Sequence, residues 1–302
     1  MEQQFLITHY YHSGFSIAWR HDLFVFDYWR GDQGELFEEA QLTEKELSAY
    51  RKIYVFITHD HVDHLDSVVF SWRQFAEVQY IVSSDMPIGI RGKRMAPGDS
   101  LELSEDVRVT AFDSTDLGVS FLLDLGGFRF FHAGDLNFWH WREESTMQEI
   151  QEAEEDFHRA VLPIQGEAVD IAFFPVDPRQ GAMFEAGADY FILSVKPRLL
   201  IPMHYFDQTE VIQEYARRAA TRSTQVLAMT EIGEQIQVQV DEAGYMNISW
   251  VRKEQVEETE EESSGEALLP LEDEDNPFDD SDLPVPQLMS EEEAPPPGRE
   301  PG

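Results

Sequence analysis

Short apolar runs separated by polar or glycine-containing breaks recur through the first half of the chain. Runs at 4–8, 15–19 and 23–26 have the length of strands and indicate a β-meander. Thr43 and Glu46 have the spacing of a capping box, which predicts a helix start. Further strands are predicted over residues 52–58, 80–84, 107–112, 119–125 and 128–135, with a hairpin at Gly126-Gly127 between the last two.

The pattern changes at Ser145, after which predicted helices and strands alternate. Ser145 and Gln148 also have capping-box spacing, which predicts that a long acidic helix begins there. The remaining predicted strands cover 169–176, 198–204, 225–229, 235–240 and 247–251, and the remaining helices cover 183–195 and about 208–221. Strands first, then alternation, then strands again predict a layered α/β sandwich.

The acidic residues are concentrated toward the end of the chain. Eighteen of the 49 residues from 254 to 302 are acidic and one is basic, so this segment carries −17 of the formal net charge of −37. High charge, many prolines and few periodic apolar residues are typical of disorder. We therefore expect one domain over residues 1–253, within the 302-residue chain, followed by an acidic disordered tail over 254–302.

Charge and composition exclude several classes of partner and site. The chain without its tail is still strongly acidic, which disfavours phosphate backbones and anionic membranes, so neither nucleic acid nor a membrane is an expected partner. There are no cysteines, hence no disulfides, cysteine-based zinc sites or thiol nucleophiles. The sequence has neither a signal-peptide pattern nor a long apolar span, so the expected location is cytoplasmic. It does not indicate an oligomeric state.

The stretch "FITHDHVDHLD", residues 56–66, concentrates candidate metal ligands directly behind a predicted strand. Side chains alternate along a strand, so His59 and His61 can converge on one cation, and Asp63 and His64 are free to bind a second. Imidazole and carboxylate donors suit zinc, and also manganese or iron. The alternative is a polar loop in which an aspartate only caps a helix. Three histidines and an aspartate within six residues favour the metal site.

The H-x-H-x-D-H pattern resembles the metallo-β-lactamase superfamily. The segments "HAGDLN" and "PMHYFD", with "YYHSGFSI" and "FVFDYW" earlier, resemble the branch that includes ascorbate-6-phosphate lactonase-like hydrolases. The resemblance runs from about residue 5 to 210 and implies a four-layer αββα sandwich. It implies one metal held by His59, His61 and Asp135, and another held by Asp63, His64, His204 and the shared Asp135.

One departure from the family pattern concerns the first metal. The family usually has a further histidine between the first motif and the bridging aspartate, but the only histidine in that interval is His132. Three residues before Asp135 on the same predicted strand, it is expected to point to the opposite face. Either Asp113 or Asp116 replaces the missing ligand, or solvent does, and a one-metal site is a further alternative.

Four residues outside the ligand set are candidates for secondary roles. Asp27 ends a predicted strand and, by the resemblance, orients a ligand histidine, although it has the position of a turn cap as well. His12 and His140 are candidate substrate contacts, with ordinary structural roles as the alternative. Arg179 is a candidate partner for a substrate carboxylate or phosphate, because its fork geometry suits both, and a surface ion pair is the alternative.

These residues together predict a metal-dependent hydrolase. A divalent metal lowers the pKa of bound water toward ~7 and so supplies a metal-bound hydroxide without a protein nucleophile. Asp63 is the candidate to orient that hydroxide or to carry a proton to the leaving group. We expect a small anionic lactone, ester or phosphoester as substrate. The alternatives are a phosphodiesterase or nuclease of the same fold and a non-catalytic metal-binding regulatory protein.

Overall fold

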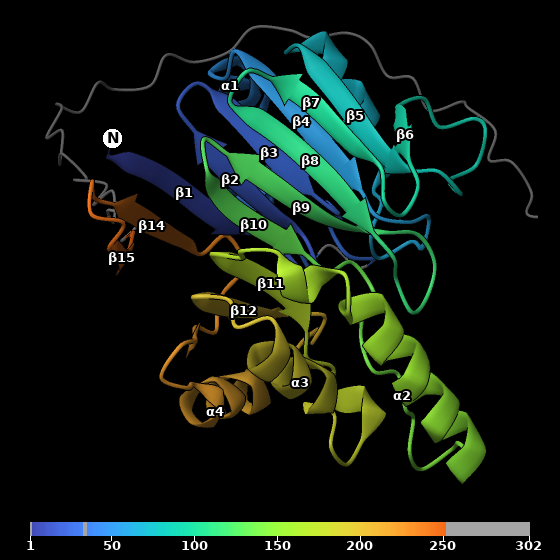
Figure 1. The fold of residues 1–302 in the computed structure, drawn as a ribbon. Coiled ribbons are helices and arrows are strands. Elements are labelled where there is room, and N and C mark those ends of the chain that lie inside the picture. Colours follow the sequence, from blue (N-terminus) through green and yellow to red (C-terminus); the bar gives the residue numbers. More distant parts are fainter. Residues whose placement is uncertain (1, 33–34, 252–302) are drawn as a thin grey trace, which may run out of the picture. The chain divides into compact units, whose positions relative to one another are not determined.

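The computed structural model describes residues 2–32 and 35–251. Two mixed β-sheets form the centre of this part of the chain (Figure 1). In spatial order the larger sheet contains β15 (Met246–Trp250), β14 (Gln235–Val240), β1 (Gln3–His9), β2 (Phe15–Trp19), β3 (Asp22–Phe26), β4 (Lys52–Ile57), β5 (Val78–Ser83) and β6 (Lys93–Met95). The smaller contains β13 (Gln225–Val226), β12 (Leu199–Met203), β11 (Ile171–Pro175), β10 (Phe128–His132), β9 (Ser120–Leu125), β8 (Val107–Phe112) and β7 (Ser100–Ser104). The predicted tail over 254–302 lies outside the described residues.

Aromatic side chains fill the space between the two sheets. Phe5 on β1 stacks on Phe128 of β10 with ring centroids 4.9 Å apart. Phe15 on β2 contacts Phe173 of β11 at 4.4 Å, and these side chains are fully or almost fully buried. Burial of aromatic surface of this size dominates core energetics. The apolar runs that predicted the strands therefore hold the sheets face to face.

Helices cover the outer face of each sheet. Leu47 of α1 (Glu44–Ser48) and Trp72 of the 3₁₀ helix η2 (Ser67–Gln74) belong to the apolar cluster on the outer face of the larger sheet. On the smaller sheet, Phe157 and Phe191 contact Phe174 of β11. These two residues lie on α2 (Met147–Val161) and α3 (Ala186–Ser194), and the remaining helices are α4 (Thr209–Ala219), η1 (Glu38–Ala40), η3 (Ile164–Gly166) and η4 (Pro178–Gln180). The predicted four-layer αββα sandwich is confirmed.

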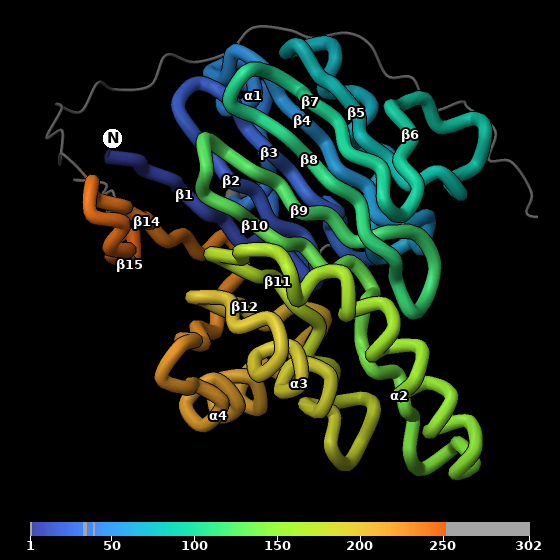
Figure 2. The backbone as a smooth tube through the Cα atoms, in the orientation of Figure 1, coloured from blue at the N-terminus to red at the C-terminus, as the bar shows by residue number. Residues whose placement is uncertain are grey.

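The path of the chain accounts for the mixed sheets. Figure 2 shows the chain completing most of the larger sheet before it enters the smaller one, then returning at its end to place β14 beside β1. Neighbours from β3 to β6 and from β10 to β13 are parallel, and the remaining neighbours are antiparallel. None of the helices in the described residues is long and apolar enough to cross a membrane.

Most predicted elements are confirmed, and the differences have local causes. Thr43 and Glu46 form the predicted capping box, and Gly126-Gly127 joins antiparallel β9 and β10. The box predicted at Ser145 is wrong by one residue: Thr146 caps α2, and its backbone N–H donates to Glu149 at 2.7 Å. Strand β10 ends at His132, and the short polar strands β6 and β7 were not predicted because they lack an apolar run.

Gly118 permits a close backbone approach next to the histidine motif. Its φ is +78°, and a Cβ there would lie 1.9 Å from the carbonyl oxygen of Thr58. We expect Gly118→Ala to combine left-handed strain of about 1–2 kcal/mol with an overpacking cost of about 1–3 kcal/mol. Gly127→Ala is the matched control, because Gly127 has φ +89° and nothing within 4 Å of the added Cβ. Urea unfolding of both variants measures the difference, and equal losses of stability would contradict the close-approach argument.

Candidate metal centre

The candidate ligands lie where strands of both sheets end. His59 to His64 follow β4 of the larger sheet, while Asp135 follows β10 and His204 follows β12 of the smaller sheet. Loops at the carboxyl ends of parallel strands are the usual position of α/β binding sites. The centre is therefore assembled by packing the two sheets, from segments that are far apart in the sequence.

Three groups of side chains have ligating atoms within 4.8 Å of one another. The groups are His12–Asp63–His64–His204, His59–His64–Asp135 and His61–Asp116–Asp135. All six predicted ligands occur in them, together with His12 and with Asp116, one of the two alternatives for the missing ligand. Metal binding by these residues stays a prediction, but the structure brings them together in one place.

Asp135 lies at the middle of this arrangement. Its Oδ2 is 3.2 Å from His59 Nε2 and 3.8 Å from His61 Nδ1. Its Oδ1 is 3.0 Å from His64 Nε2 and 3.3 Å from His204 Nε2. The two carboxylate oxygens thus face two different pairs of histidines, which is the arrangement needed to share one carboxylate between two cations.

Asp27, buried completely, orients two of these histidines from behind. Its carboxylate accepts the Nδ1–H of His64 at 2.8 Å, and it also accepts the backbone N–H and the hydroxyl of Thr58, at 2.9 and 2.7 Å. Since the Thr58 hydroxyl donates to Asp27, it accepts from His59 Nδ1 at 2.9 Å. Both histidines therefore direct Nε2 toward Asp135, because the bond made by one ring nitrogen decides which is free to bind metal.

Asp177 plays the corresponding part for His204. Its Oδ2 accepts the Nδ1–H of His204 at 3.0 Å, and the same carboxylate accepts from the Arg179 side chain. Sequence reasoning missed Asp177 and Thr58. The signal for Asp177 was available, because it follows the end of β11 as Asp27 follows the end of β3.

In the cluster, the histidines His64 and His204 and the carboxylate of Asp135 favour each other's charged forms. Burial lowers the pKa of His64, but the carboxylates of Asp135 and Asp27 outweigh it and hold that pKa well above its usual value. Burial likewise opposes the charged form of His204, yet Asp135 and Asp177 raise its pKa to about 9. Burial raises the pKa of Asp135, whereas the neighbouring His64 and His204 bring it well below its usual range.

Several buried polar atoms lack hydrogen bonds and point to a cation. Both ring nitrogens of His12 are buried without a hydrogen-bond partner, and His64 Nε2 and Asp135 Oδ1, although 3.0 Å apart, are not aligned for a hydrogen bond. An unpaired buried polar group costs free energy, so such a concentration requires an explanation. Burial lowers the pKa of His12 to about 3, and the resulting neutral imidazole suits metal binding. Nitrogen and carboxylate donors in this set fit one or two divalent cations.

The backbone at the site is also unusual. His12, Asp27 and His204 have φ of 55°, 41° and 67°, in the left-handed region that non-glycine residues rarely occupy. Such conformations cost about 1–3 kcal/mol each and persist where the surrounding structure fixes them. They concentrate at functional sites, so these values support the same location independently of the ligand chemistry.

The structure places the other predicted residues differently from one another. Arg179 lines the pocket beside the cluster. His140 is not brought there, because it is buried with Nε2 donating to the Met183 carbonyl and Nδ1 accepting from the Arg142 N–H. Asp113 belongs to none of the three groups. His12, a candidate substrate contact in the sequence, lies among the candidate ligands instead: its Nε2 is 3.4 Å from the Asp63 carboxylate.

The expectation that His132 points away from the site is wrong. Its Nδ1 is 3.8 Å from Asp27 Oδ2, and its Nε2 donates to the Ser13 carbonyl at 2.9 Å. The ring stacks on Phe26 between the sheets. Since β10 ends at His132, strand alternation does not relate His132 to Asp135. His132 thus packs behind Asp27 and belongs to none of the metal groups.

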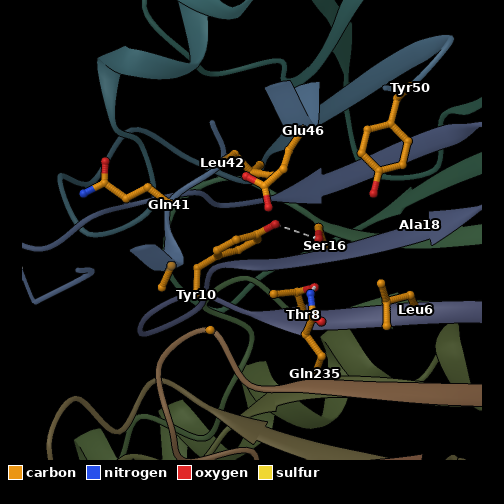
Figure 3. Close-up of a pocket in the computed structure, with 12 residues that line it drawn as sticks. Leu6, Thr8, Tyr10, Ser16, Ala18, Gln41, Leu42, Glu46, Tyr50 and Gln235 are labelled. Carbon is orange, nitrogen blue, oxygen red and sulfur yellow. Dashed lines mark hydrogen bonds between the residues drawn. The ribbon is translucent and has the colours of Figure 1, made fainter. Parts of the chain in front are cut away.

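A pocket of about 370 Å³ opens beside the cluster. Its lining residues are His61, Asp63, Thr115, Asp116, Asp135, Trp139, Trp141, Arg179 and His204. A second cavity, of about 200 Å³, lies on the outer face of the larger sheet. Figure 3 shows Tyr10 hydrogen-bonded to Ser16 there, with Glu46 above them. No histidine lines this second cavity, so its chemistry does not match the metal centre.

Comparison with known proteins agrees with this fold. The family model of the β-lactamase superfamily domain matches residues 32–205, more than half of the chain, and the chain belongs to this family. No curated protein matches the sequence.

Solved structures of low sequence identity share the fold. A metallo hydrolase from the archaeon Ignicoccus hospitalis is 17% identical, with a TM-score of 0.55, over 78% of this chain and 98% of that one. A Parabacteroides distasonis protein named as a metal-dependent hydrolase is also 17% identical, with a TM-score of 0.54, over 75% and 93%. CmlA, a diiron β-hydroxylase from Streptomyces venezuelae, is 12% identical, with a TM-score of 0.50, over 82% of this chain and 54% of CmlA.

Proposed function

We propose that this protein is a metal-dependent hydrolase whose centre takes two divalent cations, most favourably zinc, with manganese or iron as alternatives. The observation that carries the proposal is Asp135, whose two carboxylate oxygens each face a separate pair of histidines. The family of the chain and the pocket beside the cluster support it. A bound cation would also coordinate the buried nitrogen and oxygen atoms of the centre, which explains why these atoms lack hydrogen bonds within the protein.

Two ligand sets follow from the distances. The first contains His59, His61, Asp116 and Asp135, so that Asp116 supplies the donor expected from a histidine in this family. The second contains His12, Asp63, His64, His204 and the same Asp135. The hydroxyl of Thr115 holds the loop that carries Asp116, because it donates to the Asn137 carbonyl at 2.6 Å.

The residues of the pocket define the rest of the reaction. When bound, a divalent cation supplies Lewis acidity that activates water and polarises the bond to be cleaved. Asp63 faces the pocket as a carboxylate: burial raises its pKa, but His12, whose Nε2 is 3.4 Å away, and the charges of His64 and His204 lower it well below its usual value. The low pKa keeps Asp63 ionised, and the carboxylate is thereby able to orient water by accepting its hydrogen bond.

The substrate class rests on the size and charge of the pocket. A volume of about 370 Å³ fits a small metabolite. Arg179 brings positive charge to the same pocket, which suits a carboxylate or phosphate on the substrate. We infer a small anionic lactone, ester or phosphoester, as in the ascorbate-6-phosphate lactonase-like branch that the sequence resembles. A cytoplasmic location stays a prediction.

Metal analysis combined with turnover tests the proposal. Purified protein should contain up to two divalent ions per chain, and a chelator should abolish hydrolysis in a panel of lactones, esters, phosphomonoesters and cyclic phosphodiesters. Added zinc, manganese or iron should restore it. Bound metal without turnover of any panel member would favour a non-catalytic metal-binding protein.

Asp116 provides a separate prediction about stoichiometry. Asp116→Ala should reduce bound metal from two ions toward one, because the group formed with His61 and Asp135 loses a carboxylate while the His12–Asp63–His64–His204 group is unchanged. Asp113→Ala is the matched control from the same loop, outside the three groups. Inductively coupled plasma analysis measures the ratio. Identical metal content in the two variants would remove Asp116 from the ligand set.

A further inference from the structure

The pocket beside the metal centre has a second side that the ligand chemistry does not explain. The candidate ligands occupy one part of the lining, and the remainder consists of Thr115, Trp139, Trp141 and Arg179. The candidate ligands are carboxylates and imidazoles, so metal binding does not account for the two indole rings in the lining. Two large half-buried aromatic side chains side by side in a pocket are informative, because contiguous apolar patches on protein surfaces are often ligand-binding sites.

The two tryptophans stack on each other beside the candidate ligands. Their rings are stacked, with centroids 6.0 Å apart and planes inclined by 10°. Trp139 is fixed by its own hydrogen bond, since its Nε1 donates to the Asp135 carbonyl at 2.8 Å. The ring of Trp139 also lies 5.3 Å from His204. The apolar surface therefore begins directly at the candidate ligands.

The backbone of Trp141 is strained, and neighbouring contacts hold it in place. Its φ is 34°, which is unfavourable for a bulky residue. His140 fixes the preceding segment, with Nε2 bonded to the Met183 carbonyl and Nδ1 accepting from the Arg142 N–H. The Trp141 carbonyl accepts from the N–H groups of Glu144 and Ser145, both at 2.9 Å. His140 is thus a positioning residue for Trp141.

Arg179 adds a directed positive charge to the same lining. Its Nε and Nη2 donate to Asp177, and its guanidinium lies 4.3 Å above the Phe206 ring. Within residues 2–32 and 35–251, Nη1 donates to no protein atom. The guanidinium is therefore fixed in orientation, with one edge available.

Two exposed apolar side chains lie next to pocket-lining residues in the sequence. Val62, between His61 and Asp63, is 71% exposed, and Leu117, next to Asp116, is 44% exposed. Both flank residues that line the pocket.

We propose that Trp139 and Trp141 form a stacking surface that selects substrates with a flat apolar group, most simply an aromatic ring, in addition to the anionic group bound by Arg179. The inference rests on the proposed hydrolase function and narrows its substrate class. The reacting ester, lactone or phosphoester bond lies between the two groups, next to the candidate ligands. Trp141 sets the preference for the flat group, and His140 acts through Trp141.

Ligand binding tests the proposal separately from catalysis. The probes are phenylphosphonate, which is anionic and aromatic, and methylphosphonate, which is anionic only, titrated into the metal-loaded full-length protein by calorimetry. Wild-type protein should bind phenylphosphonate about 3- to 10-fold more tightly, the range expected for an aromatic contact. Trp141→Gly should remove this preference while leaving the affinity for methylphosphonate unchanged, and Trp141→Phe should keep part of it. Arg179→Gln should weaken the binding of phenylphosphonate and of methylphosphonate to the same extent.

Thermal unfolding separates loss of the contact from loss of structure. Trp141→Gly relieves the strained backbone, as Lys196→Gly does at an exposed position with φ 59° outside the pocket lining, but it also loses the Trp139 contact; its Tm should therefore lie only slightly below that of Lys196→Gly, with one cooperative transition in both. A preference for phenylphosphonate that survives Trp141→Gly in a folded protein would overturn the proposal. The expected preference in a protein that hydrolyses nothing would instead support the stacking surface and count against the hydrolase function.

Discussion

Asp135→Asn should abolish metal binding and hydrolysis together, with a larger effect than any other single change in the centre. The carboxylate contacts four histidines through its two oxygens, and the amide offers one oxygen while placing an NH₂ group toward the other pair. Loss of a residue that only orients a ligand costs roughly 10- to 100-fold in metal affinity or activity, so loss of the shared ligand should exceed about 100-fold. Metal content and kcat/KM measure the two effects.

Asp113→Asn is the matched control for this variant. Asp113 is an exposed aspartate in the loop that carries Asp116, and it belongs to none of the metal groups. It should retain full metal content and turnover. If Asp135→Asn also kept two ions per chain, the shared-carboxylate arrangement would be wrong, whatever its activity.

Metal affinity should rise steeply with pH. In the metal-free protein the pKa of His204 is raised to about 9 and that of His64 lies well above its usual value, so both hold protons at neutral pH. A cation must displace these protons, and each displaced proton makes affinity increase about tenfold per pH unit below its pKa. Between pH 6 and pH 8 this amounts to about 10²-fold for one proton and 10⁴-fold for two. The part of the increase that comes from His204 should flatten above about pH 9.

The same pKa shifts give the metal-free protein the opposite trend in stability. A histidine whose pKa is raised by folding contributes stability that is complete below its unfolded value near 6.5 and is lost as pH rises through the folded value. Chelator-treated protein should therefore lose stability toward pH 9, while metal-loaded protein should not.

Calorimetric titration of manganese into chelator-treated protein, in two buffers of different ionisation enthalpy, measures the protons released. Asp177→Asn provides the internal check. It removes an acceptor that raises the pKa of His204, so the flattening should move to lower pH. An affinity independent of pH from 6 to 8 would show that these histidines are neutral before metal binds.

The sequence predicts those site residues that belong to a short motif or directly follow a predicted strand. The H-x-H-x-D-H motif places four candidates in six residues, and Asp135 and His204 follow predicted strands. The layered fold followed from the order of strands and helices for the same reason, since each strand that faces the core carries its own apolar run.

The contributions missed or left open depend on loops that fold back. Asp116 reaches the cluster because Thr115 bonds the chain at Asn137, 22 residues on. His12 reaches it through a tight turn in which the Tyr10 N–H donates to the Gly14 carbonyl. Neither contact leaves a periodic signal. The one-residue error at the start of α2 arose because two overlapping pairs have capping-box spacing, and only geometry distinguishes them.

The origin of the ligands in two different sheets has a consequence for folding. A cation held by His64 from the larger sheet and His204 from the smaller would close a chain loop of 140 residues, as a disulfide does. In the chain-entropy description such a covalent closure restricts the unfolded ensemble by about 5 kcal/mol, although a reversible metal link applies only while the ion stays bound. In a chain that contains no cysteine, the metal centre would act as a removable cross-link, so metal supply would govern resistance to unfolding as well as turnover.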